Sequence, residues 1–457
     1  EKTAAIGAVF QWVLSKSQLE DLDELTADKK ATEDLRANRP DFTQLSNEEL
    51  FAQFQELMLQ HRKYFCQHIF TTYMATVPVG IISGVAAAVE RPDLFMPIIA
   101  GIGEVDSAEP SHALWEMGRL VSSSSELTEA FDNGVEGLLD RLGESDRGDS
   151  QAFLTAFEDF VYSYGSRGPN EWEVRSPTWE TRPELALSAI ERMRLAPEEA
   201  APKTQHAVRS AQREEAAAQL LAMVEGDPEV HGELAAGIAA SMAWLPARER
   251  TKTNNIRLIH EMRVRMRVIG ERMVAQEAFD EIEDFGFLEE TEYSALFAEP
   301  LSMLETIRVR REEYYGLLER EAQFLFYGEA DPPETWRRRD EASEDQLEPG
   351  STIQGMPGCP GMAQGRARVI LDSNDPTDLE PGDILIAPIT DPSWTPLFVP
   401  AAAVVVDVGA PLSHAIIVSR ELGIPCVVSA TDATRRIPNG ALIQVNGDSG
   451  VVTVLEE

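Results

Sequence analysis

The sequence predicts a multi-domain protein in which a large all-α region is followed by a small α/β domain. Residues 1–327 keep their apolar side chains mainly at helical spacing, whereas residues 351–457 break into short β-rich runs divided by Gly, Pro and Asp. Between the two, residues 328–350 contain Pro332-Pro333 and eight Asp or Glu with almost no apolar side chain. Such a segment cannot bury a core. We therefore expect two domains joined by a flexible acidic linker.

The composition excludes several classes of function. The chain of 457 residues has 78 acidic and 40 basic side chains, a net charge of −38. It therefore lacks the basic surface that binding to nucleic acid or to an anionic membrane requires. Its three cysteines are widely spaced, so neither a disulfide framework nor a zinc site is expected. No metal site is predicted. Because no signal-peptide pattern opens the chain, we expect a reducing, cytoplasmic location.

A long apolar stretch lies in the first third of the chain. Residues 69–89 contain no charged side chain, and an uncharged stretch of this length could span a membrane. Pro78, Gly80 and Gly84 interrupt the stretch, however, and it has no aromatic-basic flanks. We expect a pair of buried helices that wall a pocket for an apolar substrate, with plain core and a membrane span as the alternatives.

The segment around residues 164–179 is predicted to be an ordered loop. Gly165, Gly168 and Pro169 break the helical pattern, while the tryptophans of the segment favour a fixed conformation. Arg167 and Glu171 lie four residues apart, and two interpretations remain open for this pair. In the first interpretation the two side chains form an ion pair that locks a helix junction. In the second the loop contacts a substrate.

Two cations stand out before a long amphipathic run at residues 253–278. Arg248 and Lys252 are four residues apart, so on a helix both project to the same side. One interpretation is a solvated basic stripe paired with the carboxylates of this acidic protein. The other is a pair of cations that stabilises a transferring phosphoryl group, whose charge spreads over its oxygens in the transition state.

The C-terminal domain contains a strand–turn–helix pattern with a histidine at its centre. The apolar run 403–408 reads as a buried strand, and Gly409 to Leu412 as a turn. Ser413 is a suitable N-cap, so His414 falls in the first turn of a helix. Free backbone N–H groups and the helix dipole favour an added phosphoryl group there. An imidazole nitrogen is a competent nucleophile at neutral pH.

Residues 409–425 resemble the phosphohistidine motif of the phosphoenolpyruvate-utilising enzymes. The stretches 357–361, 382–385 and 390–398 fit the same swivelling domain, so the resemblance covers about residues 351–457. It implies that His414 carries the phosphoryl group and that Ser413 and Gly409 support the phosphate site. The dikinases of this family usually have a regulatory threonine where this chain has Leu412, so we do not expect that form of control.

The helical region resembles the acceptor-binding domain of the rifampicin phosphotransferases. In that family an Arg and a Lys at the same spacing attend the phosphoryl transfer, which implies catalytic roles for Arg248 and Lys252. The loop also resembles a motif of that domain, which implies substrate binding by Arg167 and Trp172.

No ATP-grasp pattern or phosphate-binding loop is visible in the sequence, although enzymes of this group use an ATP-grasp unit to phosphorylate the histidine. We therefore expect an ATP-grasp partner that supplies ATP and Mg²⁺, or a longer enzyme of which this chain is a piece, and no cofactor bound by this chain alone. The resemblance implies ATP conversion to AMP and phosphate. Our leading hypothesis is the phosphotransferase component of an aryl phosphate synthase, acting on the hydroxyl of a small phenolic substrate. The alternatives are a rifamycin phosphotransferase without its ATP-grasp domain and a phosphocarrier that relays phosphate to another protein.

Overall fold

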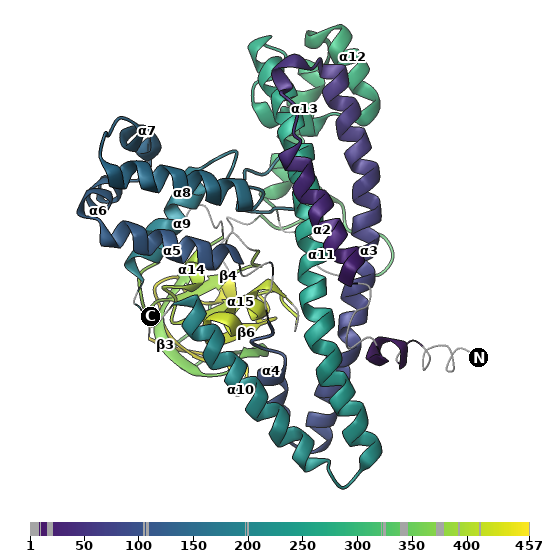
Figure 1. Cartoon of the computed structure of the whole chain (residues 1–457), viewed down its shortest axis with the longest axis vertical. Coiled ribbons are helices and arrows are strands. Elements are labelled where there is room, and N and C mark those ends of the chain that lie inside the picture. The colour runs from purple at the N-terminus through teal and green to yellow at the C-terminus, as the bar shows by residue number, and fades with distance from the viewer. Residues whose placement is uncertain are drawn as a thin grey trace.

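The structure is a computed structural model with a long helical region and a small domain built on a sheet (Figure 1). It describes residues 9, 11–15, 22–103, 106, 109–196, 198, 201–320, 322, 326–338, 346–371, 379–391, 394–410 and 413–456. Pro411, Leu412 and residues 339–345 of the predicted linker lie outside this description. The expected absence of control at Leu412 therefore stays a prediction.

Two long helices form the backbone of the helical region. Helix α3 (Asn47–Ala88) and helix α11 (Pro228–Ala275) pack along each other, and α2 (Leu22–Ala37) lies against α11 (Figure 1). Helix α3 begins with a capping box, in which Ser46 Oγ accepts from Glu49 N–H at 3.2 Å and Glu49 Oε2 accepts from Ser46 N–H at 2.8 Å. This reciprocal pairing satisfies two backbone donors and fixes where the helix starts.

The expected pair of buried helices in residues 69–89 is wrong, because α3 continues through Pro78 as a single helix. A proline removes one backbone donor, but Ala75, Val79 and Ile82 around it are buried, and this packing holds the helix together. By length and composition alone α3 could cross a membrane, although core helices of soluble proteins pass the same test. Only 33% of its apolar window is buried, so α3 keeps an exposed apolar face.

The remaining helices form a lobe beside the long pair and a cap at its upper end. Helices α5 to α9 share one apolar core, and α12 and α13 pack near the C-terminal end of α11. The helices are α4 (Phe95–Ile98), α5 (Glu109–Ser123), α6 (Ser125–Asp132), α7 (Leu138–Gly143), α8 (Gly148–Tyr164), α9 (Glu184–Leu195), α10 (Pro202–Met223), α12 (Tyr293–Ala298) and α13 (Leu304–Leu318), with 3₁₀ turns at Phe42–Gln44, Pro92–Leu94, Ile282–Phe287, Glu290–Glu292, Pro300–Met303 and Pro333–Thr335.

The C-terminal domain is an eight-stranded mixed sheet in the order β1-β8-β7-β3-β4-β5-β6-β2. Strands β3 to β6 pair in parallel, and the outer strands pair antiparallel. Both faces of the sheet carry buried apolar clusters. The elements are β1 (Thr352–Gln354), β2 (Met356–Cys359), β3 (Met362–Val369), β4 (Ile384–Ala387), β5 (Ala403–Val406), β6 (Cys426–Val428), β7 (Leu442–Asn446), β8 (Val451–Glu456), α14 (Thr395–Phe398), α15 (His414–Leu422) and α16 (Ala433–Arg436). The predicted fold class, helical region followed by a small α/β domain, is confirmed.

The described part of the predicted linker folds back onto the end of α13. Arg320 donates to the carbonyl oxygen of Glu334 at 3.1 Å, and Trp336 Nε1 donates to the carbonyl oxygen of Asp331 at 2.8 Å. Leu347 N–H then donates to the carbonyl oxygen of Arg436 at 2.8 Å, which ties residue 347 to the α/β domain. The flexibility of the segment as a whole stays a prediction.

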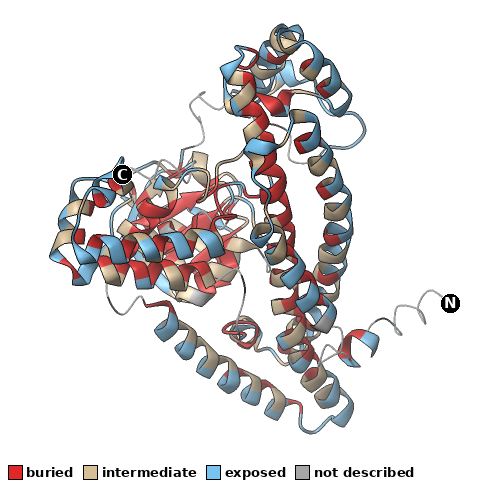
Figure 2. Cartoon of the chain, turned by 45° about the horizontal axis from the view of Figure 1, so that its top comes forward, coloured by how far each residue is buried: buried red, intermediate tan, exposed pale blue. Residues whose placement is uncertain are grey.

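The α/β domain is docked against the helical region. Helix α15 contacts α10, and α14 contacts α9, so the small domain sits in the angle between the lobe and the long helices (Figure 1). Figure 2 shows that its strands are mostly buried, with exposed residues on the surrounding helices and loops. The backbone N–H of Asn170 donates to Asp391 Oδ2 at 2.7 Å across this interface. The loop before α9 therefore contacts the α/β domain directly.

Candidate functional site

His414 stands at the first position of α15, at the end of a buried strand. Strand β5 is entirely buried, and the chain then turns sharply at Gly409. A Cβ on Gly409 would lie 2.6 Å from the Cβ of Val428, so only glycine allows this close approach to β6. Ser429 Oγ donates to the carbonyl oxygen of Gly409 at 2.6 Å and holds the turn. The predicted strand–turn–helix pattern around His414 is therefore present on both sides of residues 411 and 412.

Ser413 occupies the N-cap position with extended backbone angles, but its side chain makes no cap hydrogen bond. The prediction was right about the position and wrong about the cap. The Ser413 Oγ atom is buried and has no hydrogen-bond partner among the described residues. The start of α15 therefore offers a hydroxyl group at the N-terminus of a helix.

The imidazole of His414 is held by groups of its own domain. Its Nδ1 atom lies 3.1 Å from Thr390 Oγ1, and the ring of Phe398 meets it edge-on at a centroid distance of 5.8 Å. Desolvation lowers the pKa of His414 well below its usual value, and the positive charges of Lys252 and Arg167 lower it further. The ring is therefore neutral at physiological pH, and its Nδ1 atom is engaged with Thr390.

Lys252 and Arg167 of the helical region share one buried carboxylate close to His414. Glu171 Oε1 lies 3.1 Å from Lys252 Nζ, and Glu171 Oε2 lies 3.0 Å from Arg167 Nη1. Arg167 Nη2 also donates to Thr253 Oγ1 at 2.8 Å. The predicted ion pair between Arg167 and Glu171 thus forms inside the protein within the loop, and Lys252 and Thr253 connect it to α11. Whether Arg167 also touches a substrate stays a prediction.

Arg248 and Lys252 lie one turn apart on α11, as the sequence predicts. Their side chains are only 17% and 13% exposed, so they are not a solvated basic stripe. Arg248 forms an ion pair with Glu249, and its buried Nε atom has no hydrogen-bond partner among the described residues. Both cations are packed into the protein close to His68, and Lys252 also lies close to His414.

Trp172 and aromatic residues of α3 flank these cations. The ring of Trp172 meets Phe65 edge-on at 6.0 Å and lies 5.8 Å from the ring of His68. His68 Nδ1 lies 3.0 Å from Thr251 Oγ1 of α11. The exposed apolar face of α3 continues from Phe65 along the helix (Ile69, Phe70, Tyr73). An apolar wall therefore adjoins the polar cluster.

Sequence reasoning missed His68 and Thr390. Thr390 is 24 residues from His414 and His68 is 183 residues from Thr251, so no local pattern joins either pair. A signal for His68 does exist, because it lies seven residues after His61 and three after Phe65 on one face of a helix.

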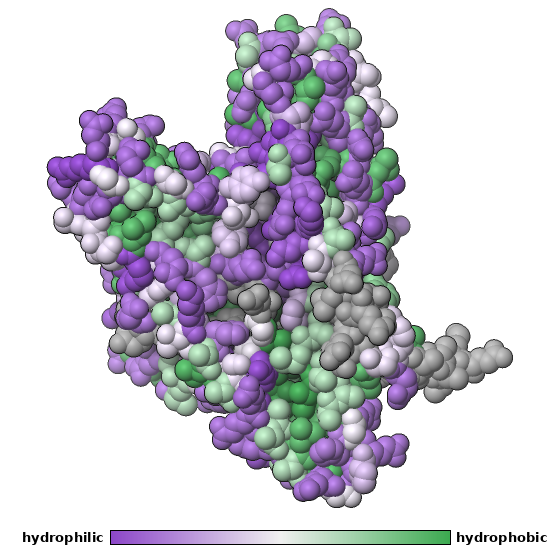
Figure 3. Space-filling model, in the orientation of Figure 1, coloured by the Kyte–Doolittle hydropathy of each residue, from purple (hydrophilic) through white to green (hydrophobic). Residues whose placement is uncertain are grey.

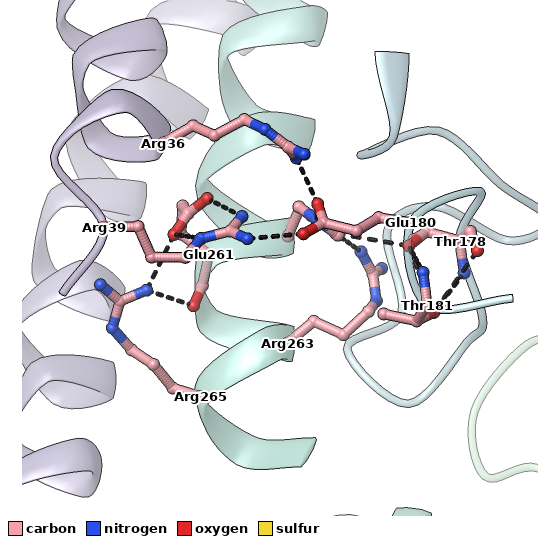
Figure 4. A network of polar contacts seen from close by, with 9 residues as sticks. Arg36, Arg39, Thr178, Glu180, Thr181, Glu261, Arg263 and Arg265 are labelled. Carbon is pink, nitrogen blue, oxygen red and sulfur yellow. Dashed lines mark hydrogen bonds and ion pairs between the residues drawn. The ribbon is translucent and has the colours of Figure 1, made fainter. Parts of the chain in front are cut away.

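An ion network anchors the loop that carries Arg167, Glu171 and Trp172. Figure 4 shows the carboxylate of Glu180 between Arg36 and Arg39. Arg39 also lies 2.5 Å from a carboxylate oxygen of Glu261 in α11. Arg263 donates to the carbonyl oxygen of Glu171 at 3.0 Å. Burial alone would raise the pKa values of these carboxylates. His260 and then Arg39 lower the pKa of Glu180, and Arg39 and then His260 lower that of Glu261, so both remain charged.

One cleft of the helical region lies away from this cluster. A cavity of about 400 Å³ lies between α2, the end of α8 and α11, and Arg36, Tyr162 and Arg257 are among its lining residues. Neither His414 nor Lys252 lines it. Among the described residues, no group of His, Cys, Asp and Glu is arranged to hold a metal ion.

Comparison with known proteins finds two matches in this chain. Residues 67–249 match the family described as "Rifampicin phosphotransferase fourth domain", and residues 379–450 match "PEP-utilising enzyme, mobile domain". The first range contains His68, Trp172 and Arg248, and the second contains Thr390 and His414.

Similar proteins include an uncharacterised protein of Mycobacterium tuberculosis, 32% identical over 294 residues, which covers 64% of this chain and 30% of the relative. A rifampicin phosphotransferase of Streptomyces sviceus is 29% identical over 360 residues (76% of this chain, 40% of the relative). An uncharacterised phosphotransferase of Bacillus subtilis is 29% identical over 364 residues (76% and 42%). The chain thus spans less than half the length of these relatives.

Proposed function

Because this chain is related to the phosphoenolpyruvate-utilising enzymes, we propose that it is a phosphotransferase component. His414 carries a phosphoryl group from an ATP-grasp partner to the hydroxyl group of a small aromatic substrate. The single observation that carries the proposal is the placement of His414. It is a neutral imidazole at a helix N-terminus, held through Nδ1 by Thr390, and docked within electrostatic range of Lys252.

The site has the features that a phosphoryl group on Nε2 needs. The buried atoms Ser413 Oγ and Arg248 Nε have no hydrogen-bond partner among the described residues, and unpaired buried donors are rare in proteins. A phosphoryl group presents three acceptor oxygens. It would also be stabilised by the N-terminus of α15 and by Lys252, whose present partner is Glu171.

The transfer step follows from this arrangement. The hydroxyl oxygen of the acceptor attacks phosphorus, the P–Nε2 bond breaks, and its electron pair returns to the imidazole of His414. Arg248 and Lys252 stabilise the charge that spreads over the phosphoryl oxygens. A solvent-exposed site would screen them, but both side chains are largely buried, which strengthens their effect.

The proposed acceptor class rests on the apolar wall next to the cations. Phe65 and Trp172 present aromatic rings beside His68. In Figure 3, apolar side chains also gather toward the lower ends of α3, α10 and α11. Aromatic side chains favour flat apolar ligands, and the nearby polar groups fix the orientation of such a ligand. A small phenol suits both features.

The ATP-grasp partner is part of the proposal, as are ATP, Mg²⁺ and the products AMP and phosphate. In this scheme the chemistry of ATP belongs to the partner unit. A second candidate acceptor is a rifamycin, because relatives that cover 76% of this chain include a protein named rifampicin phosphotransferase. A phosphocarrier that passes phosphate to another protein remains the alternative of a different class.

The test separates loading from discharge. The chain is phosphorylated chemically with phosphoramidate, which donates its phosphoryl group to histidine, and ³¹P NMR identifies an acid-labile phosphohistidine. The His414→Ala variant should lose this signal, whereas His231→Ala, at the far end of α11, should keep it. After removal of the reagent, phenol or rifampicin is added, and mass spectrometry detects a phosphate monoester. A loaded protein that transfers to neither compound would contradict the proposed function, as would a His414→Ala protein that transfers normally.

A further inference from the structure

His68 has a position that the proposed chemistry has not yet used. It lies on α3, which faces the segment of α11 that contains Arg248, Thr251 and Lys252. The residue is half-buried, and its ring packs against Trp172. An imidazole is thereby held between the two proposed catalytic cations and the aromatic wall proposed for the acceptor.

The hydrogen bonds of His68 determine which ring nitrogen is bare. Thr251 Oγ1 donates its proton to the carbonyl oxygen of Arg248 at 2.9 Å, so toward His68 it can only accept. The backbone of Arg248 also forms a hydrogen bond with the ring that raises its pKa, which requires a carbonyl acceptor. Nδ1 therefore carries the proton, and Nε2 keeps its lone pair.

Building on the proposed function, we infer that His68 is the general base that removes the proton from the acceptor hydroxyl. Nδ1–H is fixed on Thr251, so Nε2 is the nitrogen available to a ligand. The adjoining Trp172 would stack with an aromatic acceptor and bring its hydroxyl group toward this nitrogen.

The charges around His68 suit a base that works only during transfer. Burial, and then the charges of Arg248 and Lys252, lower the pKa of His68 to about 4, while Glu249 opposes them. The ring is therefore neutral before transfer. A phosphoryl group placed on Arg248 and Lys252 offsets their charge and raises the pKa of His68 toward neutrality, where a base is most effective. Glu171, which pairs with Lys252, remains a constant part of this field.

The atoms of the step balance without a further reactant. The acceptor O–H proton moves to Nε2 of His68 as the O–P bond forms and the P–Nε2 bond of His414 breaks. The electron pair of the broken bond stays on the His414 imidazole. The products are a phosphate monoester, neutral His414 and protonated His68, which returns its proton to solvent because its pKa falls again once the phosphate has left.

The experiment compares two phenols that differ in their need for a base. Phenol has a pKa of about 10, like the tyrosine side chain, whereas 4-nitrophenol is largely ionised at mildly alkaline pH. Chemically loaded His68→Gln protein should discharge to phenol about 10²- to 10⁴-fold more slowly than the parent. It should discharge to 4-nitrophenol within a few-fold of the parent. The control is His61→Gln, two turns earlier on the same helix, which should match the parent with both phenols.

The outcomes separate this inference from the proposed function. Equal slowing with both phenols would mean that His68 only positions the site, and no slowing with phenol would exclude it as the base. Either result would overturn the inference while leaving the proposed function intact. A parent protein that loads His414 but transfers to neither phenol and not to rifampicin would overturn both, and transfer to rifampicin alone would overturn only this inference. The rate of the parent with phenol should also fall at acidic pH as His68 becomes protonated, and the His68→Gln variant should lose this dependence.

Discussion

Replacement of Glu171 by glutamine tests whether the cations of the site are held by a buried charge. The side chain of Glu171 is fully buried, and each of its carboxylate oxygens faces a cation, at 3.0 Å for Arg167 and 3.1 Å for Lys252. In the variant one oxygen becomes an NH₂ group, so a donor faces a donor. If Oε1 is the oxygen that remains, it still accepts from both Lys252 and Arg167, whereas Oε2 would accept from Arg167 alone.

The expected loss of stability follows from this geometry. Breaking a buried ion pair by removing one partner typically costs about 3–5 kcal/mol, because the other charge stays buried without compensation. In Glu171→Gln the two cations lose the negative charge between them, but the amide keeps one acceptor oxygen. We therefore expect a loss of stability at the lower end of this range, about 3 kcal/mol. The matched control is Glu173→Gln on the same loop. Glu173 is 38% exposed and lies 3.6 Å from Arg175, and a surface pair of this kind contributes about 0–1 kcal/mol.

The assay is urea unfolding followed by far-UV circular dichroism. Glu171→Gln should shift the transition of the helical region to a lower urea concentration, and Glu173→Gln should leave it nearly unchanged. The effect should also depend on pH. Burial alone would raise the pKa of Glu171, but Arg167 and Lys252 hold it below its usual value. Its contribution is therefore present above the unfolded pKa and is lost as the pH falls through the folded one. Equal shifts for the two variants would refute the reasoning.

Three further predictions concern transfer, the linker and pH. Loaded Arg248→Ala or Lys252→Ala protein should discharge about 10²- to 10³-fold more slowly with unchanged loading, and normal discharge would remove both from the mechanism. Deleting about ten residues between 331 and 349 should leave the circular dichroism spectrum intact and slow turnover by limiting reach, whereas unchanged turnover would argue against travel of the domain. Burial raises the pKa of Asp407 to about 6, above its unfolded value. The folded state therefore binds a proton more readily, so stability should fall as the pH rises from about 4 to 6. Thermal unfolding of Asp407→Asn should lose this slope.

The parts of the fold that the sequence predicted are those with local causes. The buried strand and the turn before His414 follow from a β-branched run broken by Gly and Pro. Strands β1 and β2 were missed. Both are short strands at the edges of the sheet. Strand β2 contains Pro357 and Gly358, and these residues locally disfavour a strand, although an edge strand tolerates them. At Pro78 the sequence predicted a helix break that the structure does not have, because the packing of α3 on α11 outweighs the local cost of the proline.

The candidate site was predicted in its separate parts, but not in its geometry. Motif spacing pointed to His414, and helical spacing pointed to Arg248 and Lys252. The meeting of His414 with Lys252 depends on how a domain near the C-terminus docks on a helix 160 residues earlier. No pattern within either segment encodes that contact. The same holds for the sharing of Glu171 by two cations, since Lys252 reaches it only when the loop folds against α11.

The docking itself is of a kind that can be reversed. The α/β domain has its own apolar clusters on both faces of the sheet, and the helical lobe has another. Each of two clusters includes one half-buried side chain from the other domain. Val399 of the α/β domain packs on the core of the lobe, and Met96 of the helical region packs on a cluster of the sheet. The direct hydrogen bond from Asn170 to Asp391 is polar and partly exposed. Undocking would therefore leave the apolar clusters within each domain in place. Its electrostatic consequence would be larger, since His414 would leave the field of Lys252 and Arg167, and its pKa would rise toward the usual value. The docked state thus favours the neutral imidazole, which is the form that the proposed discharge of a phosphoryl group would leave on His414.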